Sequence, residues 1–122
     1  MTQSFSKPLS RLYAKGRMKD GTMNRTEARY AAHLETEKLA GNVAAYWFES
    51  LKVKIADGAC WYTPDFVVLR PDGTLELHEV KGSPKIFQDD AKVKVKACAT
   101  QYPFRMIVVY PRKGGDWQSQ EY

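Results

Sequence analysis

Three charged side chains stand on two neighbouring segments whose composition predicts β-strands. Asp65 begins the first segment, and Glu79 and Lys81 end the second. Between the segments lies Pro71-Asp72-Gly73, a sequence typical of a tight hairpin turn. Two carboxylates and an amine are groups that hold a hard divalent cation and act on a water molecule. Their relative placement therefore decides whether this hairpin carries a chemical site.

The length of the turn decides whether the three side chains share one face of the hairpin. A three-residue loop makes Arg70 and Thr74 the closing pair and places Asp65 directly across from Glu79, with Cβ atoms about 5 Å apart. A two-residue Asp-Gly turn would shift the register by one residue and turn Asp65 to the other face. We expect the three-residue loop, which also places Lys81 on the face of Glu79 because side chains alternate along a strand.

Two carboxylates at this distance repel each other unless one is protonated or a cation lies between them. Mg²⁺ is the usual cation where the ligands are a few oxygens, and we expect Mn²⁺ to substitute for it. Asp65 and Glu79 are therefore predicted to hold one or two Mg²⁺. Lys81 is predicted to orient or deprotonate an attacking water and to stabilise negative charge. His78 should point away from Glu79, so no catalytic role is predicted for it.

Composition and length narrow the class of protein. The 122 residues are 43% hydrophobic, enough for one domain with its own core. No apolar run approaches 18 residues and no N-terminal leader pattern is visible, which favours a soluble, cytoplasmic protein with no membrane partner. Cys60 and Cys98 are expected to be reduced thiols. With His33 and His78 they lack the ligand spacing of a zinc site.

The positive charge is concentrated at the front of the chain. Residues 1–30 contain seven Lys and Arg against two acids, whereas the rest of the chain contains twelve of each. A basic segment with little periodicity, here residues 1–23, is predicted to be a flexible arm that binds nucleic acid, although it could also serve only solubility. The predicted DNA-binding residues are Lys7, Arg11, Lys15, Arg17, Lys19 and Arg25, together with Lys92, Lys96 and Gln101 further along the chain.

The remaining pattern predicts a mixed α/β (α+β) domain over residues 24–111. A first helix begins at a capping box, Asn24 to Glu27, and ends before Gly41. It is expected to lie on the sheet face that carries the three charged residues. Strands are predicted at 43–55, with a bend near 49–50, at 65–70, at 75–81 and at 104–110. A second helix begins at 89–90 and stops at Pro103, and residues 112–122 are predicted to be a polar tail. The order helix, three strands, helix, strand predicts a mixed sheet flanked by helices.

Two strings in this order resemble a known family. Pro64-Asp65, thirteen intervening residues and Glu79-Val80-Lys81 are similar to the signature of the PD-(D/E)XK nuclease superfamily. The fuller strings 62–66 and 78–82 resemble its small phage-type endonuclease branch, which is related to Holliday junction resolvases. The resemblance covers roughly residues 24–110, and it implies a restriction-endonuclease-like αβββαβ core and metal-dependent DNA cleavage.

The resemblance also implies roles for single residues. The backbone carbonyl of Val80 would be a further metal ligand, and Gln101 would line the active-site groove. Glu27 has two interpretations that do not exclude each other: a capping carboxylate, or an acid that reaches the metal through water. Trp61 and Tyr62, just before the site, would stack on a nucleotide or cover the edge of the core.

The expected function is hydrolysis of phosphodiester bonds by an endonuclease acting on branched DNA such as a Holliday junction, in the host cytoplasm if the chain is phage-encoded. Because one small site cuts one strand and a junction needs two symmetric cuts, a homodimer is expected. Two alternatives remain: a nickase or a restriction- or repair-type nuclease on linear DNA, and a non-catalytic DNA-binding module of the same fold.

Overall fold

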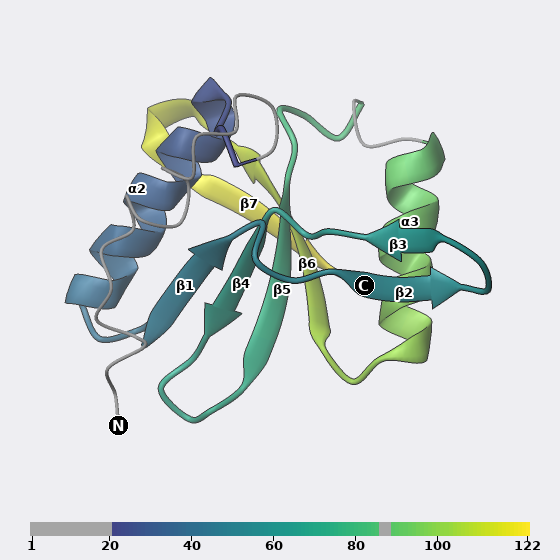
Figure 1. Ribbon diagram of the computed structural model, residues 1–122. Helices are drawn as coiled ribbons and strands as arrows, with labels where there is room; N and C mark the ends of the chain where they lie inside the picture. The colour runs from purple at the N-terminus through teal and green to yellow at the C-terminus, as the bar shows by residue number, and fades with distance from the viewer. Residues whose placement is uncertain (1–20, 86–88) are drawn as a thin grey trace.

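The computed structural model describes residues 21–85 and 89–122 (Figure 1). Most of the predicted basic arm, including Lys7, Arg11, Lys15, Arg17 and Lys19, lies outside the described residues. The helices and strands are α2 (Arg25–Leu39), β1 (Ala45–Phe48), β2 (Val53–Ala56), β3 (Cys60–Tyr62), β4 (Phe66–Leu69), β5 (Leu75–Val80), α3 (Asp89–Gln101), β6 (Arg105–Pro111), the short 3₁₀ turn η2 (Lys113–Gly115) and β7 (Trp117–Glu121). Neither α-helix in this part of the chain is long and apolar enough to cross a membrane.

A mixed five-stranded sheet forms the centre of the molecule. Its strand order is β1-β4-β5-β6-β7, with β5 and β6 parallel and the other pairs antiparallel. Helix α2 covers one face and α3 the other (Figure 1). The α2 side buries Tyr30 and Leu34 against Phe66 and Val68, and the α3 side buries Val95 among residues of β5 and β6. The prediction of a mixed α/β protein with a flanking helix on each side is confirmed.

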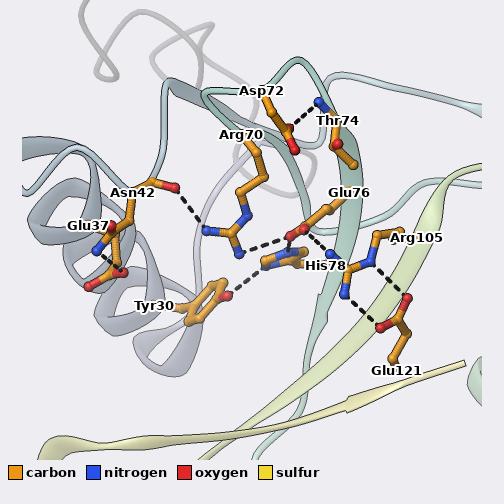
Figure 2. A network of polar contacts seen from close by, with 10 residues as sticks. All are labelled: Tyr30, Glu37, Asn42, Arg70, Asp72, Thr74, Glu76, His78, Arg105 and Glu121. Carbon is orange, nitrogen blue, oxygen red and sulfur yellow. Dashed lines mark hydrogen bonds and ion pairs between the residues drawn. The ribbon is translucent and has the colours of Figure 1, made fainter.

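The hairpin of β4 and β5 has the three-residue loop expected from the sequence. The backbone N–H of Arg70 donates to the carbonyl of Thr74 at 2.9 Å, and Gly73 takes the positive φ of 91° that the turn requires. The side chain of Asp72 accepts a hydrogen bond from the Thr74 N–H, which stabilises the turn (Figure 2). Phe66 pairs with His78 and every other pair follows the same register, so the register continues to Asp65 opposite Glu79.

Helix α2 lies on the opposite face from the one we expected. Its capping box forms, and its buried residues Tyr30, Ala31 and Leu34 pack on the face of Phe66 and Val68 rather than on that of Val67 and Leu77. The sequence left this choice open because β4 is apolar on both faces, so its pattern does not say which face receives which helix. The prediction of the covered face was wrong.

The single bent strand predicted at 43–55 is two strands that belong to different sheets. The first strand ends before Glu49, which adopts a positive φ of 47°. The second strand, β2, lies outside the main sheet and pairs with β3. This second hairpin packs on α3, where the side-chain amide of Gln101 donates to the Ile55 carbonyl at 2.6 Å and the Tyr102 hydroxyl donates to the Lys54 carbonyl. The alternation of Val53 and Ile55 predicted a strand, but it carried no information about its partner.

The segment predicted as a polar tail, 112–122, contains the edge strand β7. It pairs antiparallel with β6, from Pro111 opposite Trp117 to Ile107 opposite Glu121. Four of its five residues are exposed, because an edge strand with one face in solvent needs little apolar character. The polar composition that indicated a tail is therefore compatible with a strand, and the polar-tail prediction was wrong.

Candidate functional site

The predicted site lies where the carboxyl end of β5 meets the start of β4. Asp65 directly precedes β4, Glu79 is the penultimate residue of β5, and Lys81 follows it. The Lys81 Nζ lies 3.4 Å from Glu79 Oε2. The backbone N–H of Lys81 donates to the Val109 carbonyl at 3.0 Å, which fixes this end of β5 beside β6. The structure thus brings together the three side chains that were predicted from the sequence to form the site.

Asp65 is held by the backbone of β5. Its Oδ2 accepts a hydrogen bond from the Val80 N–H at 2.8 Å, while Oδ1 has no hydrogen-bond partner among the described residues. In the continued register Val80 lies opposite Pro64. Because a proline nitrogen carries no hydrogen, Pro64 cannot donate a backbone hydrogen bond to the Val80 carbonyl. In an extended strand the N–H and C=O of one residue point to the same side. The Val80 carbonyl therefore also faces the Asp65 side, as a ligand at this position would need.

Glu79 is 7% exposed and held by two side chains. The hydroxyl of Tyr62, on β3, donates to Glu79 Oε1 at 2.6 Å, and Oε2 faces Lys81. Burial raises the pKa of the Tyr62 hydroxyl, and the Glu79 charge raises it further, so Tyr62 remains an O–H donor. The sequence had suggested stacking or covering roles for this tyrosine. Its contact with Glu79 depends on the separate β2–β3 hairpin, which no local pattern predicted.

The two carboxylates make the site electrostatically costly without a cation. Burial raises the pKa of Asp65 well above its usual range, and the charge of Glu79 adds to the rise. Burial likewise raises the pKa of Glu79, although the hydrogen bond from Tyr62 and the charge of Lys81 lower it in part. A buried pair of this kind gains stability from either a proton or a metal ion.

Glu27 forms the predicted cap. Its Oε1 accepts from the Asn24 N–H at 2.9 Å, and the Asn24 side chain accepts from the Glu27 N–H at 2.8 Å. The charge of Glu27 also raises the pKa of both Asp65 and Glu79. The first turn of α2 therefore lies within electrostatic reach of the site, so the capping role and a role toward a metal are compatible.

The donor set suits a hard cation. It consists of two carboxylates and one backbone carbonyl, which are oxygen ligands of the kind that Mg²⁺ prefers. Within residues 21–85 and 89–122, no three acid, histidine or cysteine side chains converge as a complete metal site. Cys60 and Cys98 are both free thiols. The candidate oxygen donors are the carboxylates of Asp65 and Glu79 and, from the strand geometry, the carbonyl of Val80.

None of the other described residues predicted to bind DNA forms a hydrogen bond or ion pair with Asp65, Glu79 or Lys81. Lys92 and Lys96 are exposed on α3, and Arg25 is exposed in the first turn of α2. Gln101 ends α3 just before β6 begins, at the opposite end of the parallel β5–β6 pair from Glu79. Its amide is bonded to Ile55 and holds β2 on α3. The structure therefore does not bring Gln101 to the site.

A second polar cluster occupies the α2 face of the sheet (Figure 2). Glu76 and His78 are 1% and 2% exposed. Glu76 binds Arg70, Arg105 and His78, and His78 Nδ1 lies 2.6 Å from the Tyr30 hydroxyl. A carboxylate only accepts, so His78 Nε2 carries the hydrogen and Nδ1 accepts from Tyr30. Because His78 lies on the face opposite Glu79, this cluster is separate from the candidate site.

Comparisons of the chain with family models, curated proteins and solved structures found no match. Any function of this chain therefore has to follow from the site and its geometry.

Proposed function

We propose that the protein is a metal-dependent DNA endonuclease of the PD-(D/E)XK type. In this proposal it cleaves branched DNA and acts as a symmetric homodimer. The observation that carries the proposal is the convergence of Asp65 and Glu79 at the end of one hairpin, with Lys81 Nζ 3.4 Å from Glu79. The order of α2, the antiparallel strands β1, β4 and β5, α3 and β6 supports a restriction-endonuclease-like core. The β2–β3 hairpin and β7 are additions to that order.

In this proposal each residue has a distinct task. Asp65, Glu79 and the Val80 carbonyl would hold Mg²⁺, which when bound would supply positive charge for the scissile phosphate and favour deprotonation of a water. The Tyr62 hydroxyl and the Val80 N–H each occupy one carboxylate oxygen. Asp65 Oδ1 would therefore be available to the cation, whereas Glu79 Oε2, which faces Lys81, would be shared between Lys81 and the cation. Lys81 orients the attacking water and stabilises the negative charge that develops on the phosphate.

Cleavage of a labelled four-way junction and of a matched linear duplex tests the proposal. We expect cleavage with Mg²⁺ or Mn²⁺, its loss with EDTA, and binding without comparable cleavage in Ca²⁺, whose geometry is looser. Asp65→Asn should lower the rate at least about a hundredfold, because several kcal/mol of transition-state stabilisation are lost. Asp57→Asn, in the exposed β2–β3 turn, is the matched control.

Three results would redirect the proposal. Full activity of Asp65→Asn would remove the site from the mechanism. Equal cleavage of linear duplex and junction would favour the nickase or restriction-type alternative. Tight DNA binding with no cleavage under any metal would favour a non-catalytic binding module.

A further inference from the structure

Two adjoining hollows form a trough on the α2 face, beside η2 and β7. The first, about 410 Å³, lies between α2 and the η2 turn and is lined by Arg29, His33 and Trp117 among others. The second, about 350 Å³, shares His33 and Trp117 with the first and extends over the sheet to Arg112 and Val109. Volumes of this size suit single nucleotides rather than the width of a duplex.

Two exposed arginines carry the unpaired positive charge of the trough. Arg29 and Arg112 are exposed, and neither guanidinium forms a hydrogen bond or ion pair with another described residue. Arg70, which lines the inner part, is by contrast bonded to Glu76 and to the Asn42 carbonyl (Figure 2). Asp116 is the acid among the described residues that line the two hollows. Two arginines against one aspartate leave a local excess of positive charge for an anion.

An aromatic residue, Trp117, lines both the hollow that contains Arg29 and the hollow that contains Arg112. The Trp117 ring packs edge-on against Tyr30, with ring centroids 4.8 Å apart, and lies 6.2 Å from the His33 ring. Trp117 is only half-buried and lines both hollows, so part of its indole ring is available to a ligand. Cations beside a fixed aromatic ring are the arrangement that binds phosphates and stacks bases of unpaired strands.

The trough reaches the same end of the sheet as the candidate active site. Val109 lines the second hollow, and its carbonyl accepts the hydrogen bond from the Lys81 N–H. Val109 is also the register partner of Val80. On α2, Arg29 follows two residues after Glu27, whose charge acts on both site carboxylates. A strand that leaves the site toward the α2 face would therefore enter the trough.

We propose that this trough binds an unpaired DNA strand next to the cut, with phosphates on Arg29 and Arg112 and a base on Trp117. The inference rests on the proposed nuclease function and deepens it. The substrate class becomes DNA with a single-stranded segment beside the scissile phosphate, as at a splayed branch, rather than an uninterrupted duplex.

Fluorescence anisotropy with a labelled oligothymidylate, in the absence of metal, measures the trough directly. Arg29→Gln/Arg112→Gln should weaken binding about tenfold at 0.1 M salt and lower the slope of log K against log salt by about 1.4, because each lost phosphate contact on a single strand accounts for about 0.7. Lys38→Gln/Lys54→Gln removes the same charge elsewhere on the chain and should leave the affinity unchanged. Trp117→Leu should cost at least about fivefold, and Trp117→Phe less, since a phenyl ring still stacks.

An affinity of the double arginine variant equal to that of the control would overturn the proposal. Circular dichroism checks the fold, and should Trp117→Leu unfold, the two exposed arginines decide the question alone. Cleavage assays separate the two proposals. If the protein cleaves DNA but the trough variants bind the oligonucleotide as tightly as the wild type, only the proposal for the trough is refuted. A protein that never cleaves, yet loses binding with these variants, would refute the nuclease proposal and leave the trough standing.

Discussion

The hydroxyl group of Tyr62 is one of the two contacts that orient Glu79. Tyr62 is 5% exposed, and its hydroxyl occupies Glu79 Oε1. Tyr62→Phe removes only that oxygen. We expect a loss of about 1–2 kcal/mol in the free energy of unfolding, because a buried hydrogen bond to an ionised group is lost, and a several-fold weaker affinity for Mn²⁺, because the carboxylate is free to rotate. Denaturant unfolding and calorimetric Mn²⁺ titration measure the two effects.

Tyr110→Phe is the control for this substitution. Tyr110 is also buried, and its hydroxyl has no hydrogen-bond partner among the described residues. An unchanged Mn²⁺ affinity in Tyr62→Phe, together with a loss of stability, would restrict Tyr62 to a structural role.

His78 makes the stability of the fold depend on pH. Burial lowers its pKa in the folded protein, against opposing contributions from Glu76. Tyr30 on α2, Arg70 at the end of β4 and Arg105 on β6 are the other groups around it. Below its usual pKa of about 6.5 the unfolded chain binds a proton that the folded state does not, so stability falls as pH decreases. His78→Gln should reduce this fall by up to about 1.4 kcal/mol per pH unit below 6.5.

Urea unfolding of both proteins between pH 7.5 and about 5 checks this expectation. The raised pKa values of Asp65 and Glu79 act in the opposite sense, since those acids favour the folded state as they gain protons. The difference between wild type and His78→Gln cancels their contribution. Parallel stability curves for the two proteins would contradict the expectation. Burial alone would raise the pKa of Glu76, but its hydrogen bonds with His78 and Arg70 lower that pKa to about 2. Glu76 therefore contributes to the pH dependence only at more acidic pH.

At the scale of elements, what the sequence could predict was local. The turn 71–73 fixes the register between Asp65 and Glu79, and the capping box fixes the start of α2, so both were predictable from a few neighbouring residues. The break at Glu49, the pairing of β2 with β3 and the addition of β7 depend on contacts far apart in the sequence. For this reason the two acids of the candidate site were found from the sequence, whereas the contact of Tyr62 with Glu79 and the placement of Trp117 and Arg112 were not.

The first turn of α2 offers a test that separates its two roles. Glu27→Gln keeps an oxygen that can accept the hydrogen bond from the Asn24 N–H, but it removes the charge that acts on Asp65 and Glu79. We expect the free energy of unfolding to change by less than about 0.5 kcal/mol, because the cap survives. The affinity for Mg²⁺ should fall several-fold, because the site loses negative charge.

Asn24→Ala is the converse variant. It removes the side chain that caps the Glu27 N–H and should cost about 1 kcal/mol of stability while leaving the charge of Glu27 in place. Metal titration of both variants, alongside thermal unfolding, decides between the roles. If Glu27→Gln binds Mg²⁺ as the wild type does, Glu27 serves the helix alone.

At the scale of the whole molecule, the proposed chemistry is gathered at one end of the sheet. The carboxyl end of β5 carries the acids, the first turn of α2 contributes Glu27, and η2 with Arg112 follows the carboxyl end of β6 (Figure 1). In the proposed function, the described residues of each 13.9 kDa chain would supply one cutting centre. One centre cuts one strand, so an enzyme that cuts a branched substrate symmetrically needs two copies related by a two-fold axis.

We therefore predict a homodimer, of about 28 kDa from two chains of 13.9 kDa, at micromolar concentration. Sedimentation velocity of the protein alone measures its mass. The same measurement on the Asp65→Asn variant bound to a four-way junction gives the number of chains on each junction. Two chains for each junction, and cuts at symmetry-related positions in opposing strands, are the expected results, because a two-fold dimer places both centres equivalently. A single chain bound to the junction, with independent cuts on either strand, would contradict the dimer while leaving Asp65, Glu79 and Lys81 in their proposed roles.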